Sequence, residues 1–250
     1  TSPELAIKRL LASGLGDAYE LGPVFRQGEA GRRHNPEFTL LEWYRVGWDE
    51  HRLMDEVAEL LAALLGDLGA PRRAAYGDWL QRATGLDVHD ATTRDLRAAL
   101  SEFTELSDAP LTRDDLLDLL FAYAVAPTFP TSALTFVHDY PASQAVLAQL
   151  SEDDPRVARR FEVYLGELEL GNGFYELRDA DEQRARFERE NDLRRALGKP
   201  TCAPDEAFLA ALAAGLPECA GVAIGVDRIV MLATGVDDIA ATLAFGFDVA

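Results

Sequence analysis

Cysteine is scarce in this chain of 250 residues, which contains only Cys202 and Cys219. The two cysteines are far from C-x-x-C spacing, and no cluster of histidines accompanies them. These absences exclude a disulfide scaffold and a cysteine-histidine zinc site. They also favour the cytoplasm, where thiols stay reduced, as the compartment of the protein.

Positive charge is scarce as well, because 24 Lys and Arg oppose 43 Asp and Glu and leave a net charge of −19. A surface this acidic repels phosphate backbones, which argues against general nucleic-acid binding. No apolar run approaches the roughly 20 residues that a membrane-spanning helix needs, and the start does not resemble a signal peptide. We therefore expect neither a membrane nor a nucleic acid as partner.

Hydrophobic residues make up 48% of the chain, and their spacing predicts strands interrupted by helices. A period of two between Tyr19 and Tyr44 predicts a long hairpin. Helices are predicted over 3–13 with Ser2 as N-cap, 49–65, 181–197, 205–214 and 227–233, strands over 134–140, 160–165, 167–177 and 221–226, and a helix-rich acidic segment over 67–130. Hairpins in place of regular βαβ units indicate an α+β fold whose mainly antiparallel sheet is flanked by helices. Because there is no repeat or linker, residues 1–250 are predicted to form one domain.

The predicted hairpin carries the first group of candidate functional residues. Alternation along a strand places an aromatic ring, a carboxylate and a phenol in one row, from Phe38, Leu40, Glu42 and Tyr44. The preceding stretch adds a local positive cluster, made of Arg26, Arg32, Arg33 and His34. Such a cluster suits a polyphosphate. The alternative is a surface hairpin whose arginines pair with nearby acids, and spacing alone does not decide between the two.

A second group lies between residues 161 and 177. If Leu165-Gly166 forms a two-residue turn, Glu162 and Glu169 lie opposite each other, and a cation such as magnesium would relieve their repulsion. A turn at Gly166-Glu167 would separate the pair and leave a solvated acidic hairpin. Asn172-Gly173 predicts a second turn or a bulge, and a bulge would aim Glu176 toward the same site.

A third group closes the chain. Gly221 and Gly225 leave one strand face bare, so that a flat ring could lie against the backbone. Arg228 follows near the start of a helix, where the macrodipole disfavours a cation unless an anion binds there. Taken alone the pattern is weak, because a glycine-containing strand before a helix is common.

Together these stretches resemble motifs 2 and 3, and the acidic strands between them, of the lysine branch of class II aminoacyl-tRNA synthetases. The resemblance runs from Ser2 to about Leu243. Within the branch, four runs are most similar to the paralogues that ligate lysine to elongation factor P: TSPE at 1–4, GRRHNPEF at 31–38, LEWYR at 41–45 and PASQA at 141–145. The resemblance implies ATP and Mg²⁺ as cofactors, lysine or β-lysine and elongation factor P as substrates, no tRNA, and a homodimer. Motif 1 is not recognisable, and because the chain begins at Thr1 we expect it in a missing start.

Carried over residue by residue, the resemblance implies two catalytic arginines, Arg26 and Arg228. The implied ATP site consists of Arg26, Gln27, Gly28, His34, Phe38, Glu169, Leu170, Gly225 and Arg228. The implied amino-acid pocket consists of Ser2, Pro3, Glu4, Glu42, Tyr44, Asn172, Phe174, Glu176 and Ala223. The implied magnesium ligands are Glu162 and Glu169.

Two positions depart from the family pattern. Gly28 stands where motif 2 usually has Glu, and Glu29 follows it, which leaves the role of that acid open. Ala223 stands where motif 3 normally has Gly, in keeping with a preference for β-lysine over α-lysine. Two other functions stay open: a lysyl-tRNA synthetase fragment, and a non-catalytic synthetase-like regulator. The chain retains the phosphate residues and the metal residues together, which argues against a non-catalytic regulator.

Overall fold

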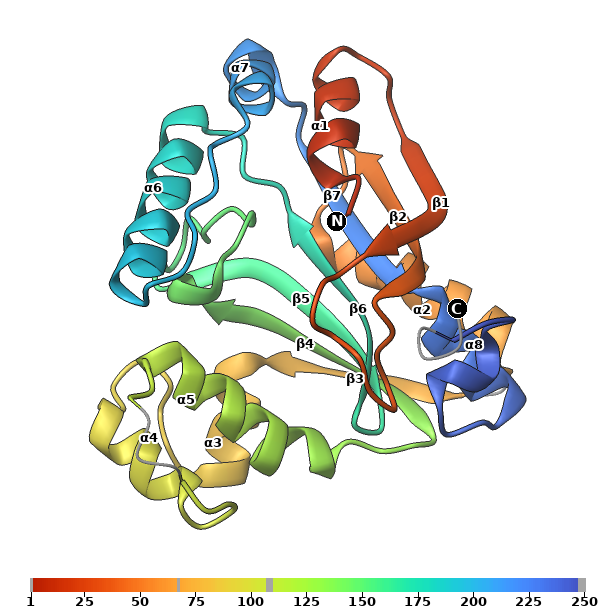
Figure 1. The fold of residues 1–250 in the computed structure, drawn as a ribbon, viewed down its shortest axis with the longest axis vertical. Helices are drawn as coiled ribbons and strands as arrows, with labels where there is room; N and C mark the ends of the chain where they lie inside the picture. Colours follow the sequence, from red (N-terminus) through yellow and green to blue (C-terminus); the bar gives the residue numbers. More distant parts are fainter. Residues whose placement is uncertain (1, 67, 107–109, 247–250) are drawn as a thin grey trace.

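The computed structural model describes residues 2–66, 68–106 and 110–246; Thr1, the first residue of the 1–4 run, lies outside them. Seven strands form one sheet in the order β1-β2-β7-β6-β5-β4-β3 (Figure 1). Neighbouring strands run antiparallel except β3 and β4, which pair in parallel. The predicted α+β fold with a mainly antiparallel sheet is confirmed.

The elements follow the predicted order along the chain. The strands are β1 (Ala18–Phe25), β2 (Glu37–Val46), β3 (Gly69–Ala75), β4 (Ala133–Pro141), β5 (Val157–Leu165), β6 (Leu168–Tyr175) and β7 (Cys219–Gly225). The α-helices are α1 (Glu4–Ala12), α2 (Glu50–Leu65), α3 (Tyr76–Thr84), α4 (Thr93–Leu100), α5 (Arg113–Leu120), α6 (Ala180–Ala196), α7 (Glu206–Gly215) and α8 (Val226–Thr234). The predicted helices and strands therefore form, with ends shifted by a few residues.

Helix starts are set mostly by capping side chains. The Asp49 carboxylate accepts a hydrogen bond from the backbone N–H of Arg52 at 2.8 Å and begins α2. For α1 the prediction is wrong in detail, because Pro3 occupies the cap position and Ser2 lies outside it. The Ser2 hydroxyl accepts a hydrogen bond from the Glu4 N–H at 3.0 Å and donates one to Glu42 at 2.6 Å. Ser2 therefore ties the start of α1 to β2.

Strand β3 is an element that the pattern did not predict. Its sequence GAPRRAA lacks period-two alternation and contains Pro71, so local preference does not favour a strand. Parallel pairing with β4 holds it at the edge of the sheet, where five of its seven residues are exposed. Tertiary pairing therefore overrides local propensity in this segment.

The two faces of the sheet differ in what covers them. On one face, α2 packs Leu53, Met54 and Val57 against Phe161 of β5 and Ile224 of β7. On the other, α3 and α5 cover the end of the sheet near β4, while α1 and α7 pack together beyond its opposite end (Figure 1). The central strands β2, β7 and β6 are left facing a cleft. No helix in the described parts of the chain is long and apolar enough to cross a membrane.

Candidate active site

A cavity of about 550 Å³ opens over the central strands. The structure brings most of the predicted site residues to its wall: Ser2, Glu4, Arg26, His34, Phe38, Glu42, Tyr44, Glu162, Glu169, Leu170, Asn172, Phe174, Glu176, Ala223, Gly225 and Arg228. Pro3, Gln27 and Gly28 are not among the lining residues. Pro3 caps α1, and the other two form an exposed turn just after β1.

One end of the cavity gathers cations. Arg26 lies just beyond β1, with its guanidinium 5.7 Å from the centre of the Phe38 ring. Arg228, in the first turn of α8, donates a hydrogen bond to the backbone carbonyl of Glu169 at 2.6 Å and lies 2.8 Å from Nε2 of His34. Burial and the Arg228 charge lower the pKa of His34, so its imidazole is neutral at pH 7 and Nε2 accepts from Arg228.

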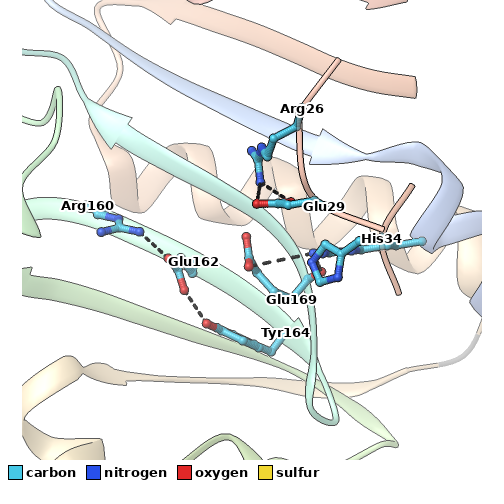
Figure 2. Close-up of polar contacts among 8 residues, drawn as sticks. Arg26, Glu29, His34, Arg160, Glu162, Tyr164 and Glu169 are labelled. Atoms are coloured by element: carbon cyan, nitrogen blue, oxygen red, sulfur yellow. Dashed lines mark hydrogen bonds and ion pairs between the residues drawn. The ribbon is translucent and has the colours of Figure 1, made fainter. Parts of the chain in front are cut away.

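Glu29, one position after the place where motif 2 usually has Glu, lies beside Arg26. Its Oε2 is 3.2 Å from the Arg26 guanidinium, and both side chains are largely exposed (Figure 2). An exposed pair of this kind contributes little stability and separates easily. Glu29 is therefore an exposed counterion of Arg26.

The turn of the β5–β6 hairpin is not at Leu165-Gly166, the first of the two positions considered from the sequence. Leu165 pairs with Leu168, so the turn is Gly166-Glu167, and Glu162 lies opposite Asn172. Gly166 has φ of +56°, which a two-residue hairpin turn requires and glycine adopts at little cost. Asn172-Gly173 is continuous strand, neither turn nor bulge; the irregularity lies earlier, between Glu169 and Gly171. The predicted pairing of Glu162 with Glu169 across the hairpin is therefore wrong.

Both carboxylates nevertheless face the cavity. Glu162 accepts hydrogen bonds from Arg160 and from the Tyr164 hydroxyl (Figure 2). The Glu169 carboxylate lies 3.9 Å from the Arg228 guanidinium. The Glu169 side chain keeps 43% exposure where it faces the cavity, and the wall of the cavity encloses the rest of it. That enclosure and the nearby Glu162 charge raise the pKa of Glu169 above its usual range.

The other end of the cavity is acidic. Glu42 accepts hydrogen bonds of 2.6 Å from the hydroxyls of Ser2 and Tyr44. Glu176 is 1% exposed and its Oε2 lies 2.6 Å from Nζ of Lys8, which also contacts Glu4 at 2.6 Å. Burial raises the pKa of Glu42 and opposes the charged form of Lys8, but the two carboxylates around Lys8 outweigh burial and raise the pKa of its ammonium.

Lys8 and Arg160 are charged residues at this site to which the sequence assigned no role. Lys8 follows Glu4 by four residues on one helix face, a spacing that predicts their contact. Arg160 precedes Glu162 by two residues on one strand face, which also predicts a contact. The Arg160 guanidinium donates to the side chain of Asn172 and to the backbone carbonyl of Gln144, each at 3.0 Å. Arg160 thus joins the acidic end of the cavity to Glu162.

Strand β7 forms the floor. A Cβ atom at Gly221 would lie 2.4 Å from the Tyr44 ring and 2.6 Å from Oε1 of Glu176, so only glycine fits there. Two residues on, Ala223 lines the cavity between Glu42 of β2 and Asn172 of β6. At Gly225 a Cβ atom would meet nothing closer than 3.7 Å. The floor of the cavity therefore leaves less room for a side chain at Gly221, near the acidic end, than at Gly225.

The sequence pattern of the class II tRNA synthetases (D, K and N) matches residues 1–248. An elongation factor P--(R)-beta-lysine ligase of Proteus mirabilis is 51% identical over 247 residues, which cover 98% of this chain and 76% of that protein. The protein of the same name from Photorhabdus laumondii is 50% identical with the same coverage, and that from Salmonella paratyphi B is 49% identical over 250 residues, or 99% and 77% of the two chains. As its motifs predict, the chain belongs to the class II aminoacyl-tRNA synthetase family.

Proposed function

We propose that this chain activates lysine, in the form of β-lysine, with ATP and ligates it to a lysine side chain of elongation factor P. The observation that carries the proposal is one cavity with an acidic pocket at one end and arginines beside an aromatic ring at the other. Two relatives that are named for this activity are 51% and 50% identical to this chain over 98% of its length. Their names support elongation factor P as the protein substrate. The whole chain acts as one catalytic domain.

ATP fits the cationic end. The Phe38 ring offers a stacking face for adenine, and Arg26, His34 and Arg228 offer donors to phosphate oxygens. Arg26 and Glu29 already stand as an exposed ion pair, so a phosphate can replace the Glu29 carboxylate. Gly225 and Leu170 line the cavity near Arg228 without blocking this end.

Magnesium fits beside Glu162 and Glu169. The described residues contain no group of three metal-ligating side chains, but Mg²⁺ is commonly held by one or two carboxylates together with substrate phosphates. Burial and then the nearby Glu162 charge raise the pKa of Glu169, and a divalent cation between the two carboxylates would relieve their repulsion. When bound, the ion would neutralise charge on the phosphates.

The reaction needs no protein nucleophile. A carboxylate oxygen of the amino acid attacks the α-phosphorus of ATP, the bond to the bridging oxygen breaks, and pyrophosphate leaves. The amine of the acceptor lysine then attacks the carbonyl carbon, loses a proton as the amide forms, and AMP leaves. Arg26 and Arg228 contribute by orienting the phosphates and by stabilising the charge that develops on them.

The acidic pocket selects the amino acid. Glu4, Glu42 and Glu176 complement a substrate with two ammonium groups, and the Asn172 and Phe174 side chains complete the wall. The methyl group of Ala223 shapes the floor next to Glu42, and one methyl group is worth roughly 1–3 kcal/mol in discrimination between similar substrates. Because the family normally has glycine at this position, the Ala223 methyl group supports β-lysine, and not α-lysine, as the substrate.

A homodimer in the cytoplasm completes the proposal. β1 is an edge strand, and its Tyr19 and Leu21 side chains keep 75% and 58% exposure. Apolar side chains on an open sheet edge are typical of a surface covered by another chain. Cys202 and Cys219 are free thiols, which suits a reducing compartment, and the acidic surface disfavours tRNA.

The test is pyrophosphate exchange with ATP and either β-lysine or α-lysine, followed by transfer to purified elongation factor P or to lysine tRNA. We expect exchange to be faster with β-lysine, transfer to the protein, and none to tRNA. Transfer to tRNA alone would identify a tRNA synthetase instead. Binding of lysine without any exchange would identify a non-catalytic regulator.

Replacing both Glu162 and Glu169 by glutamine should raise the magnesium concentration that half-activates exchange by about tenfold or more, because two ligand charges are lost. A magnesium titration of the exchange rate measures this. Glu167→Gln, in the turn between them and 54% exposed, is the matched control and should titrate like the parent. Full activity of the parent in excess chelator would refute the metal assignment.

A further inference from the structure

Lys8 is a buried ammonium group for which the proposed chemistry has no use. Its side chain is 1% exposed, although lysine is almost never fully buried unless it is paired. Nζ lies 2.6 Å from Oε1 of Glu4, 2.6 Å from Oε2 of Glu176 and 6.0 Å from the centre of the Phe174 ring. All three partners line the cavity where the amino acid is proposed to bind. Lys8 therefore lies directly behind the wall of the pocket.

The charges around this wall can be counted. Three carboxylates converge on it, from Glu4 of α1, Glu42 of β2 and Glu176 after β6, and Lys8 supplies one ammonium. Arg160 also reaches this end of the cavity through Asn172, but its charge is balanced by Glu162. The Tyr44 phenol lines the cavity and the Cys219 thiol lies near Glu176; burial raises the pKa of both, so both are neutral at pH 7.

With all three carboxylates ionised, the pocket has two negative charges that Lys8 does not compensate. Burial raises the pKa of Glu42 and of Glu176, so a bound cation is needed to hold both in the ionised form. Lysine and β-lysine each carry two ammonium groups.

We propose that Lys8 is a specificity-determining positioning residue of the amino-acid site: a resident counterion that orients Glu4 and Glu176 and leaves the pocket two positive charges short. The inference rests on the proposed function, because it requires a diamino acid as substrate. An amino acid with one ammonium would leave a buried carboxylate uncompensated, which is costly. Lys8 itself does not touch the substrate.

The proposal has a consequence for pH dependence. Burial favours the neutral form of Glu176, and Lys8 is the cation that opposes this effect. Without Lys8 the pKa of Glu176 rises further, so the carboxylate is protonated at a higher pH and stops attracting the substrate. The acidic limb of the pH profile of kcat/KM for lysine should therefore move to higher pH.

The test compares Lys8→Met, which keeps the volume and removes the charge, with Arg9→Met, an exposed neighbour on the same helix. In pyrophosphate exchange with β-lysine, Lys8→Met should raise the KM for β-lysine about 30-fold or more and move the acidic limb upward. The KM for ATP should stay within threefold of the parent. Arg9→Met should match the parent in all three quantities.

A second variant guards against misfolding. Lys8→Ala removes three methylenes and the ammonium, so added propylammonium should fill the space and restore activity, while propanol should not. An unchanged KM for β-lysine with an unmoved pH limb, an equal loss for ATP and β-lysine, or no rescue by the ammonium would overturn the role of Lys8. A parent chain without lysine-dependent exchange would overturn the proposed function, and this inference with it.

Discussion

Replacing Arg228 by alanine is expected to slow lysine-dependent pyrophosphate exchange by about 100- to 1000-fold, the usual loss when one preorganised donor to developing charge is removed. Arg228 is the arginine that His34 and the Glu169 carbonyl hold in place, so its guanidinium is fixed before ATP arrives. Arg26 pairs with Glu29 on the surface and lies over the Phe38 ring, so its guanidinium is held less firmly. We therefore expect Arg26→Ala to lose a similar factor in rate, but with a smaller effect on thermal stability.

The exchange rate at saturating ATP and lysine measures the effect, and circular dichroism checks that the fold is intact. Arg195→Ala is the matched control, because Arg195 is 63% exposed on α6 and pairs only with Asp192 nearby. Its rate should equal that of the parent. Activity of Arg228→Ala within tenfold of the parent would remove Arg228 from the phosphate site.

Glu176→Gln is expected to raise the KM for lysine by about 100-fold and to leave the KM for ATP nearly unchanged. The carboxylate is 1% exposed and pairs with Lys8, so the amide leaves the Lys8 ammonium with Glu4 alone and removes one charge that the substrate needs. Lost partners of buried charges account for effects of this size.

Steady-state exchange kinetics with each ligand varied in turn separate the two KM values. Glu218→Gln provides the comparison, because Glu218 is 61% exposed next to β7 and pairs with Arg178 at 3.0 Å outside the cavity. Equal losses for lysine and ATP in Glu176→Gln would show that Glu176 supports the scaffold instead of selecting the amino acid.

Much of the fold and of the candidate site could be predicted from rules that involve only residues close in sequence. Alternation along β2 depends only on backbone geometry, so the shared face of Phe38, Glu42 and Tyr44 could be predicted before any contact was known. The start of α2 at Asp49 likewise follows from one side chain and the N–H groups next to it. Where a feature depends on residues close in sequence, the pattern is sufficient.

Features set by distant contacts could not be predicted in the same way. β3 forms because it pairs with β4, and nothing in its sequence GAPRRAA indicates a strand. The β5–β6 register depended on which of two adjacent residue pairs makes the turn and on the irregularity between Glu169 and Gly171. Together these moved the partner of Glu162 from Glu169 to Asn172. The burial of Lys8 depends on its ion pair with Glu176, which is 168 positions away in the chain. Only the folded sheet brings the two residues together.

Strand β7 also constrains how this enzyme can evolve. Of its three cavity-facing positions, 221 accepts no side chain at all, because any Cβ would overlap Tyr44 and Glu176. Position 225 has room for a Cβ, which would make an ordinary contact with Arg228 at 3.7 Å, so a change there acts at the arginine end of the cavity. Position 223 is left as the one place on this strand where a small mutation alters the amino-acid pocket and little else. Descendants that switch substrate are therefore expected to pass through changes at residue 223, and repeated, independent lineages should converge on the same few small residues there.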